Sequence, residues 1–224
     1  MAVACGLVGI IIGTVLGSGL GYRLSNVLVD ASHGNLMLLL VMTMVVCLIL
    51  GMGLPTSATY LVLATLVAPA MIKMGVVPMA AHMFLFYFGI ISNVTPPVAM
   101  ASYAAAGIAQ CNPSKCGYRA FKLAFPGFVL PFMFVYNPVL LGKGIWYMVL
   151  YSFITAMVGV YCISTGFEGV LGHSFLKSWQ RIIIFIAGLL FMTPSMVTDA
   201  IGLAIGLLIF FVARRQKILA ETNV

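Results

Sequence analysis

Charged residues are scarce in this chain. Of its 224 residues, only 7% are charged and 63% are hydrophobic, whereas about 25% of the residues of a soluble globular domain carry charge. This deficit excludes an ordinary water-soluble domain. Apolar runs of membrane-spanning length recur along the chain and do not alternate with polar residues. The composition therefore predicts an all-α polytopic membrane protein that lies in a lipid bilayer.

Acidic residues and catalytic motifs are also scarce. The four acidic residues and three histidines are scattered, mostly between the apolar runs, so no nucleophile–base–acid arrangement is visible and an enzyme is not expected. Phosphate-binding loops and zinc-binding HExxH or CxxC motifs are missing from the sequence, and no cofactor is expected. The net charge of +7 comes from a few connecting segments, which does not indicate nucleic-acid binding. The five cysteines lack the spacing of metal ligands, and we expect free thiols: Cys5, Cys47, Cys111, Cys116 and Cys162. Cys111 and Cys116 flank a short loop, so these two could also form a disulfide.

Glycine and proline, by contrast, interrupt the apolar runs at particular places. The first span is predicted over 3–22, followed by a polar connector over 23–35. Its glycines recur every four residues along one face, which favours close helix packing over ligand binding: Gly9, Gly13, Gly17 and Gly21.

The next apolar stretch, 36–72, is too long for one crossing. As a single helix it would measure roughly 55 Å, against a hydrocarbon core of about 30 Å. A Gly/Pro-rich interruption at 51–57 divides it into two arms of roughly 24–26 Å. This pattern predicts a re-entrant hairpin that enters the membrane and returns to the same side.

A second interruption lies at Ser92–Val98, inside the segment 79–110. Pro96 and Pro97 cannot donate backbone hydrogen bonds, and each disfavours helix at the preceding residue. The arms 79–92 and 98–110 measure roughly 20 Å each, so together they make about one crossing. We therefore expect one broken membrane helix rather than a second hairpin.

The remainder predicts further spans at 120–141 and 146–165, and a last apolar region over 182–212, interrupted near 193–195 and followed by a basic tail. Basic residues are more frequent in the connectors 111–122 and 166–181, which the positive-inside rule places in the cytoplasm. Whether 182–212 crosses once or twice is left open. The predicted division is 1–35 (first span and connector), 36–110 (transport-type core), 111–165 (spans after the core) and 166–224 (last membrane segments and basic tail).

The two interruptions together predict a binding site. Unwound carbonyls and hydroxyls suit Na⁺, and the N-termini of half-helices suit carboxylates. No Asp or Glu lies in either interruption, which favours Na⁺ over a proton relay. Thr56, Ser57, Asn93 and Thr95 supply side-chain oxygens beside the interruptions, and Gly51 and Gly53 allow close approach of the backbone. Ser92 supplies a further hydroxyl beside the break.

These residues resemble a known family. Gly51-Met52-Gly53-Leu54-Pro55-Thr56-Ser57-Ala58 and the following 68–75 look like the second re-entrant hairpin of the large permease subunit of tripartite ATP-independent periplasmic (TRAP) transporters. The stretch 93–107 resembles the broken helix that follows it. Residues 126–141 are similar to the fused-permease subgroup that works with TAXI-type binding proteins.

The resemblance implies an elevator-type secondary transporter of inverted repeats in a bacterial or archaeal inner membrane. It implies Na⁺-driven symport of a small organic acid, such as a C4-dicarboxylate, delivered by a TAXI-type periplasmic binding protein. The hairpin tip and the broken helix would then form part of a Na⁺ site and one wall of the substrate site. The ion- and substrate-binding residues that this resemblance implies are Gly51, Gly53, Pro55, Thr56, Ser57, Asn93, Thr95, Pro96 and Pro97, with Gly51, Thr56, Asn93 and Thr95 as the candidate Na⁺ ligands.

Two departures from the family pattern stand out. Leu54 occupies the position before the tip proline, where many relatives have an aspartate, so the ligand set is expected to differ. The first-repeat hairpin and its broken helix are not in these 224 residues. We therefore expect the C-terminal, second-repeat part of a permease, which would need the remaining N-terminal portion for transport. The alternative is a membrane assembly subunit that does not transport and whose interruptions are only kinks.

Overall fold

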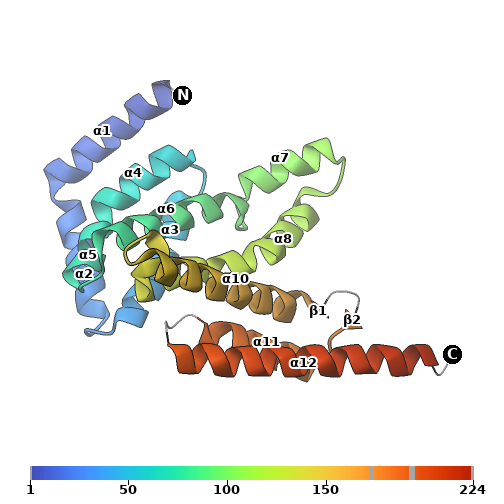
Figure 1. Ribbon diagram of the computed structural model, residues 1–224. Helices are drawn as coiled ribbons and strands as arrows, with labels where there is room; N and C mark the ends of the chain where they lie inside the picture. The colour runs from blue at the N-terminus through green and yellow to red at the C-terminus, as the bar shows by residue number, and fades with distance from the viewer. Residues whose placement is uncertain (1, 172–173, 192–194, 223–224) are drawn as a thin grey trace. The chain divides into compact units, whose positions relative to one another are not determined.

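The computed structural model describes residues 2–171, 174–191 and 195–222, and its fold is almost entirely helical (Figure 1). The chain divides into two compact units, Met1–Ala124 and Phe125–Val224. The expected all-α class is confirmed, with one short β-hairpin added in the second unit.

The first unit holds eight α-helices within its described residues, and one 3₁₀ turn. Their bounds are α1 (Ala2–Ser18), α2 (Leu20–Ala31), α3 (Leu36–Gly51), α4 (Thr56–Leu66), α5 (Ala68–Lys73), α6 (Pro78–Ile91), η1 (Ser92–Val94), α7 (Met100–Ile108) and α8 (Pro113–Ala124).

The second unit is built around the long helix α10. Its elements are η2 (Phe125–Phe128), α9 (Leu130–Tyr136), η3 (Pro138–Leu141), α10 (Trp146–Glu168), β1 (Val170–Leu171), β2 (Ser174–Phe175), α11 (Ser178–Leu190) and α12 (Met196–Thr222). The two strands pair antiparallel, with Val170 opposite Phe175.

Both predicted interruptions of the first unit are present. Helix α3 ends at Gly51 and α4 begins at Thr56, because Met52 is extended, Gly53 has a φ of 81° and Pro55 precedes the new helix. Helix α6 ends at Ile91 and is followed by the 3₁₀ turn η1, and the chain becomes α-helical again only at Met100. The two breaks in the helices are therefore present where the sequence predicts them.

Two predicted connectors are in fact largely helical. Residues 23–35 were expected to be a polar connector after one span, but α2 continues to Ala31, after a bend at Gly19 with a φ of 67°. The basic stretch 111–122 also contains most of α8. Polar residues were interpreted as loops here, although both segments are amphipathic helices with one buried side.

The core of the first unit consists of the hairpin and the first half of the broken helix. Helix α6 packs against both α3 and α4. The largest fully buried apolar side chains of this unit come from α3 to α6: Leu39, Leu40, Leu63, Met71, Phe84, Leu85 and Phe88. The rings of Phe84 and Phe88 lie 4.8 Å apart between centroids. Close packing of this kind holds helices together in lipid, where burial from water offers no advantage.

Helix α2 is held against α4 and α5 by polar contacts. Ser25 Oγ donates to Leu66 O at 3.2 Å, and Lys73 Nζ donates to Asn26 Oδ1 at 2.7 Å. A Cβ on Gly21 would lie 3.1 Å from Thr65 O, so this glycine permits close approach. The other three glycines of the predicted small-residue face have open space around the Cα, so the close packing expected of that face is found at Gly21 and not at Gly9, Gly13 or Gly17.

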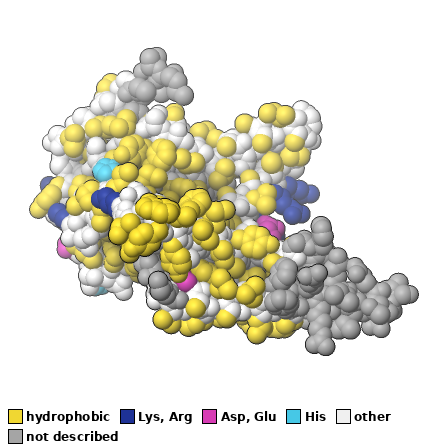
Figure 2. All heavy atoms as spheres, viewed as in Figure 1, with side chains coloured by type: hydrophobic (Ala, Val, Ile, Leu, Met, Phe, Trp, Pro, Cys, Tyr) yellow, Lys and Arg dark blue, Asp and Glu magenta, His cyan; other side chains and the backbone are white. Residues whose placement is uncertain are grey.

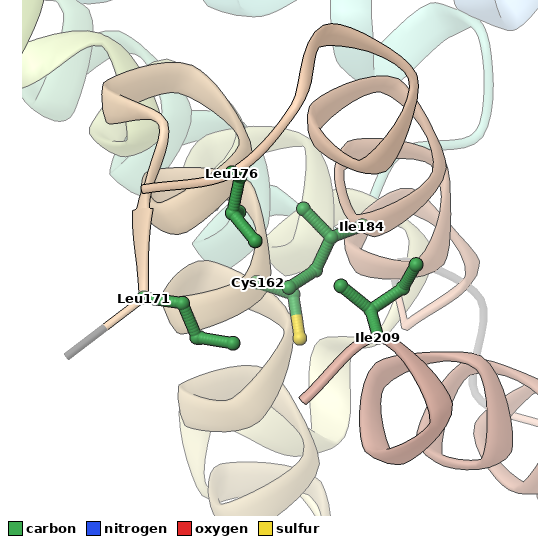
Figure 3. Close-up of a cluster of buried hydrophobic side chains, with 5 residues drawn as sticks. All are labelled: Cys162, Leu171, Leu176, Ile184 and Ile209. Carbon is green, nitrogen blue, oxygen red and sulfur yellow. The ribbon is translucent and has the colours of Figure 1, made fainter. Parts of the chain in front are cut away.

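The second unit is packed through glycines on facing helices. A Cβ on Gly188 of α11 would lie 2.5 Å from Ile163 Cγ1 and 2.9 Å from Gly159 O of α10. Helices α11 and α12 run antiparallel, since Gly202 lies against Ala187 while the later Ile209 joins the earlier Ile184. Figure 3 shows the latter pair converging with side chains of α10 and the β-hairpin in one buried cluster: Cys162, Leu171, Leu176, Ile184 and Ile209.

The antiparallel pairing means that the last apolar region folds as two helices. Of the predicted interruption at 193–195, Thr193 and Pro194 lie outside the described residues, and Ser195 precedes α12. The predicted basic tail lies in the last part of α12, whose backbone is helical to Thr222.

The surface fits a membrane environment. Hydrophobic side chains cover most of the described surface on the face in Figure 2, and exposed apolar residues occur on nearly every helix. Within the described residues, two helical stretches are long and apolar enough to cross a bilayer, 113–136 and 146–168. Shorter apolar helices include α3, α4, α11 and the α6–η1 segment, as expected where spans are interrupted.

Replacing Gly188 with alanine is expected to destabilise the second unit by about 1–3 kcal/mol, because the new methyl group would collide with Ile163 and with backbone. Thermal unfolding of the purified chain in detergent would measure the loss. Gly206→Ala is the matched control, since its Cβ would meet only Cys162 Sγ, at 3.7 Å. Equal stability of the two variants would contradict the close packing of α10 on α11.

Candidate functional site at the two helix interruptions

The hairpin tip and the break in the following helix meet directly. Ser92 Oγ lies 3.1 Å from Gly51 O and 2.8 Å from Gly89 O, and its single proton can be donated to either carbonyl. Ser92 is 1% exposed, so this contact is buried. A Cβ on Gly51 would lie 2.5 Å from Ser92 Oγ, which shows why glycine is needed at the end of α3.

Thr59 of α4 closes the same contact from a third helix. Its methyl carbon would lie 3.1 Å from a Cβ on Gly51 and 3.2 Å from one on Gly89. Its hydroxyl donates back to Pro55 O at 3.1 Å, which satisfies a carbonyl of the tip. These four residues, Gly51, Thr59, Gly89 and Ser92, are named the tip–break junction below.

Within the break, side chains hydrogen-bond to carbonyls of α6. Thr95 Oγ1 donates to Ile91 O at 2.8 Å, and Asn93 Nδ2 donates to Gly89 O at 3.3 Å. These bonds satisfy carbonyls at the end of α6 that no longer have helical partners. A hydroxyl that donates its proton keeps two lone pairs, so Thr95 Oγ1 can still accept a hydrogen bond or coordinate a cation. Asn93 donates through its amide nitrogen, which leaves Asn93 Oδ1 able to do the same.

The predicted residues of the tip are more accessible than those of the break. Gly53, Pro55, Thr56 and Ser57 are exposed, whereas Thr95 is 8% exposed. Thr56 and Ser57 occupy the first turn of α4, where backbone N–H groups lack helical partners. The structure therefore brings Gly51 into contact with the break, while the other predicted tip residues are exposed at the surface.

A cavity opens on the other side of the break. It has a volume of about 370 Å³ and is lined by both prolines of the break and by residues of α7 and α8: Pro96, Pro97, Tyr103, Ser114, Gly117 and Tyr118. Tyr103 Oη donates to Pro97 O at 2.7 Å, so the tyrosine is fixed by the break itself. Figure 1 shows the chain turning back after α7 into α8, and these two helices are in contact.

Two buried hydroxyls of the first unit have no hydrogen-bond partner among the described residues. They belong to Thr43 in α3 and Ser102 in the first turn of α7. A buried polar group without a partner is costly, and such groups often mark the site of an ion or water. Ser102 lies at the N-terminal end of the half-helix that follows the break, where negative charge is favoured.

The chemistry available at this site is that of neutral oxygens. Hydroxyl, amide and carbonyl oxygens converge on the interruptions, and no group of three or more His, Cys, Asp or Glu side chains occurs anywhere in the described ranges. Such a set suits a weakly held monovalent cation and a hydrogen-bonded ligand rather than a transition metal. His82 is placed away from this role by its contact with Tyr60 Oη, at 3.2 Å from Nδ1.

The two interruptions could be predicted from the sequence, but several residues around them were not predicted. Thr59 lies one helical turn after Thr56, and this spacing of hydroxyls was the available signal. Gly89 lies one turn before Asn93 on α6. Tyr103, Ser114 and Tyr118 carried no local signal, because they reach the break only through the packing of α7 on α8.

One comparison with known proteins gave a match. The family model described as "Tripartite ATP-independent periplasmic transporter, DctM component" matches residues 1–147, which includes both interruptions and the cavity. Neither the curated proteins nor the solved structures gave a match.

Gly51→Ala is expected to destabilise the first unit by about 1–3 kcal/mol, because its methyl group would collide with the Ser92 side chain. Thermal unfolding in detergent would report the loss, and hydrogen exchange of residues 52–55 would report faster opening of the tip. Gly107→Ala, where a Cβ would meet nothing within 4 Å, is the control.

A double-mutant cycle identifies the contact responsible. In a Ser92→Gly background the two closest atoms are gone, so Gly51→Ala should cost clearly less than in the wild type. If the cost of Gly51→Ala is the same in both backgrounds, the tip–break junction does not exist as described.

Proposed function

Because the chain belongs to the family of the DctM component of tripartite ATP-independent periplasmic transporters, we propose that it forms the second-repeat part of a Na⁺-coupled permease for small organic acids. Family membership makes the chain a membrane permease component rather than a member of an enzyme family. It also implies an inner-membrane location and work with a periplasmic binding protein and a small membrane subunit.

The tip–break junction carries the proposal. Breaking a membrane helix frees backbone groups that need hydrogen-bond partners, which costs free energy in lipid. Two such breaks lie in contact through Ser92 in this chain. Interrupted helices of this kind form ion and substrate sites in secondary transporters. We place the Na⁺ ligands at Gly51, Thr56, Asn93 and Thr95, the oxygen-bearing residues on either side of the junction.

The cavity behind the break supports an acidic substrate. The hydroxyl groups of Ser114 and Tyr118 are donors suited to a carboxylate, whereas Tyr103 Oη already donates to Pro97 O. The volume of the cavity fits a small organic acid. The sequence from residue 31 to residue 167 contains no Asp or Glu, so no carboxylate of this segment would repel an anion. Lys115 and Arg119 on α8 add positive charge on the helix that lines the cavity.

The partners that we propose follow from the family of the chain and from the similarity of residues 126–141. The similarity of 126–141 to the fused-permease subgroup points to a TAXI-type binding protein as the donor of the substrate. A complete site would also need the remaining permease portion, which supplies the first-repeat hairpin and its broken helix. In that assembly the second repeat contributes one wall of the site and moves with it as an elevator.

An assembly subunit with simple kinks is the competing function, and one observation favours it. The side chains of Asn93 and Thr95 hydrogen-bond to carbonyls of their own helix, as they would in a kink without a ligand. The two functions differ in whether these side chains affect ion dependence.

Thr95→Ala and Thr56→Ala are expected to weaken the Na⁺ dependence of uptake, because each removes a proposed ligand oxygen. The Na⁺ concentration for half-maximal uptake should rise about tenfold, the effect of roughly 1.4 kcal/mol of lost binding. Uptake of a labelled organic acid into proteoliposomes containing the complete permease, with its binding protein, would measure it.

Thr65→Ala is the matched control, since this hydroxyl lies on the same helix as Thr56 and donates to carbonyls one turn earlier in that helix. All variants are compared at equal amounts of inserted protein. Unchanged Na⁺ dependence for both Thr56→Ala and Thr95→Ala would favour the assembly subunit.

Ser114→Phe is expected to fill the cavity and to raise the KM for the organic acid at least about tenfold, with little change in Na⁺ dependence. The same uptake assay at varied substrate concentration measures this. Leu123→Phe adds bulk to an exposed position of the same helix and serves as the control. An unchanged KM for Ser114→Phe would exclude the cavity as a substrate site.

A further inference from the structure

A buried acidic residue in the second unit lies outside the family match. Asp199 occupies the first turn of α12, in the apolar region 182–212, where its backbone N–H donates to Ser195 O at 3.0 Å. Its side chain is 6% exposed. Of the four acidic residues of the sequence, it alone lies within a predicted membrane segment. Charged groups at such positions are costly and are retained mainly for function.

The two carboxylate oxygens of Asp199 have different surroundings. Oδ2 accepts a hydrogen bond from Tyr151 Oη of α10 at 2.7 Å. Oδ1 is buried and has no hydrogen-bond partner within the described part of the chain. A carboxylate has room for several donors, so this one is only partly satisfied and calls for a further positive partner.

A favourable interaction with the helix dipole explains only part of this arrangement. An acid in the first turn of a helix is stabilised by the nearby N–H groups, and more strongly when it is partly buried than at the surface. Here the side chain is buried, and the hydrogen bond that Oδ2 accepts comes from Tyr151 of another helix. The helix dipole therefore explains why an acidic residue is favoured at this position, but it does not give Oδ1 a hydrogen-bond partner.

Within the described residues, the charged groups of α11 and of the residue before it lie near the other end of α10. Arg181 of α11 donates to Gly166 O and Phe167 O, near the end of α10 opposite to Tyr151. Lys177 is the residue that precedes α11, at the same far end. The remaining titratable side chains of α10 are Tyr147, Tyr161, Cys162 and Glu168, and the hydrogen bond to Asp199 comes from Tyr151.

We propose that Asp199 and Tyr151 form a binding site for a monovalent cation, a proton or Na⁺, in which the carboxylate Oδ1 is the ligand atom. A proton taken from water would convert the carboxylate to a carboxylic acid, with Tyr151 Oη still donating to Oδ2. Na⁺ would instead be coordinated by Oδ1 while the carboxylate stays ionised. The interruptions of the first unit lack an acidic group, and this site supplies one.

Infrared difference spectroscopy of the full chain reconstituted in liposomes tests the proposal. Spectra are compared between acid and neutral pH in K⁺ medium, and between Na⁺ and K⁺ media at fixed pH. A proton site gives the carbonyl band of a carboxylic acid shielded from water. A Na⁺ site shifts the carboxylate bands in a saturable way with Na⁺ concentration.

Either signal must be lost in Asp199→Asn and retained in Asp30→Asn, which alters an exposed acid. Glu168→Gln must also retain it, so that the signal is assigned to Asp199. Tyr151→Phe should move the carbonyl band to higher wavenumber, because the carbonyl loses its donor, or weaken the response to Na⁺ about tenfold. Asp199→Glu, which keeps the carboxyl group, shows whether loss in Asp199→Asn is due to misfolding.

Two outcomes would overturn the site. Identical carboxylate bands in all media would show that Asp199 binds neither cation, and a signal that persists in Asp199→Asn would belong to another group. The result is independent of the proposed transport function, because Thr56→Ala and Thr95→Ala should leave the Asp199 signal unchanged even if they abolish Na⁺-dependent uptake.

Discussion

The contact between Ser92 and Gly51 is the interaction on which the first unit depends. Two helices end at this point, one at the hairpin tip and one at the break, and each end leaves carbonyls without helical partners. Ser92 Oγ reaches a carbonyl of both helices, which is possible only because Gly51 has no side chain. The same contact joins the two places where a ligand would find unwound backbone.

The rest of the interrupted backbone is stabilised by nearby hydroxyl groups. Thr59 donates to the tip, Thr95 donates to the end of α6, and Tyr103 donates to Pro97 within the break. In lipid an unpaired carbonyl costs several kcal/mol, so these hydroxyls explain how the breaks persist without charged residues. Because each hydroxyl uses only its proton, their oxygens stay available for a cation.

The positions of the breaks could be predicted from the sequence, because glycine and proline restrict the backbone wherever they occur. The helix α2 could not, since its polar residues were interpreted as a connector, and Lys73, which holds it, is 47 positions away from Asn26. The cavity was also missed. Tyr103 and Ser114 become neighbours of Pro97 only when α7 folds onto α8, and that packing has no local signature. Site residues that act through backbone geometry were thus predictable, whereas those brought in by tertiary contacts were not.

The two units divide the available chemistry between them. In the first unit, the interruptions offer neutral oxygens and a carboxylate-free surrounding, which suits a weakly bound cation and an anionic substrate. In the second unit, Asp199 offers a buried carboxyl group to which Tyr151 donates a hydrogen bond. Neutral oxygens attract a cation through their dipoles, whereas a carboxylate attracts it with a full negative charge. Ion dependence measured on the whole permease would therefore combine both contributions, and the variants of each unit are needed to separate them.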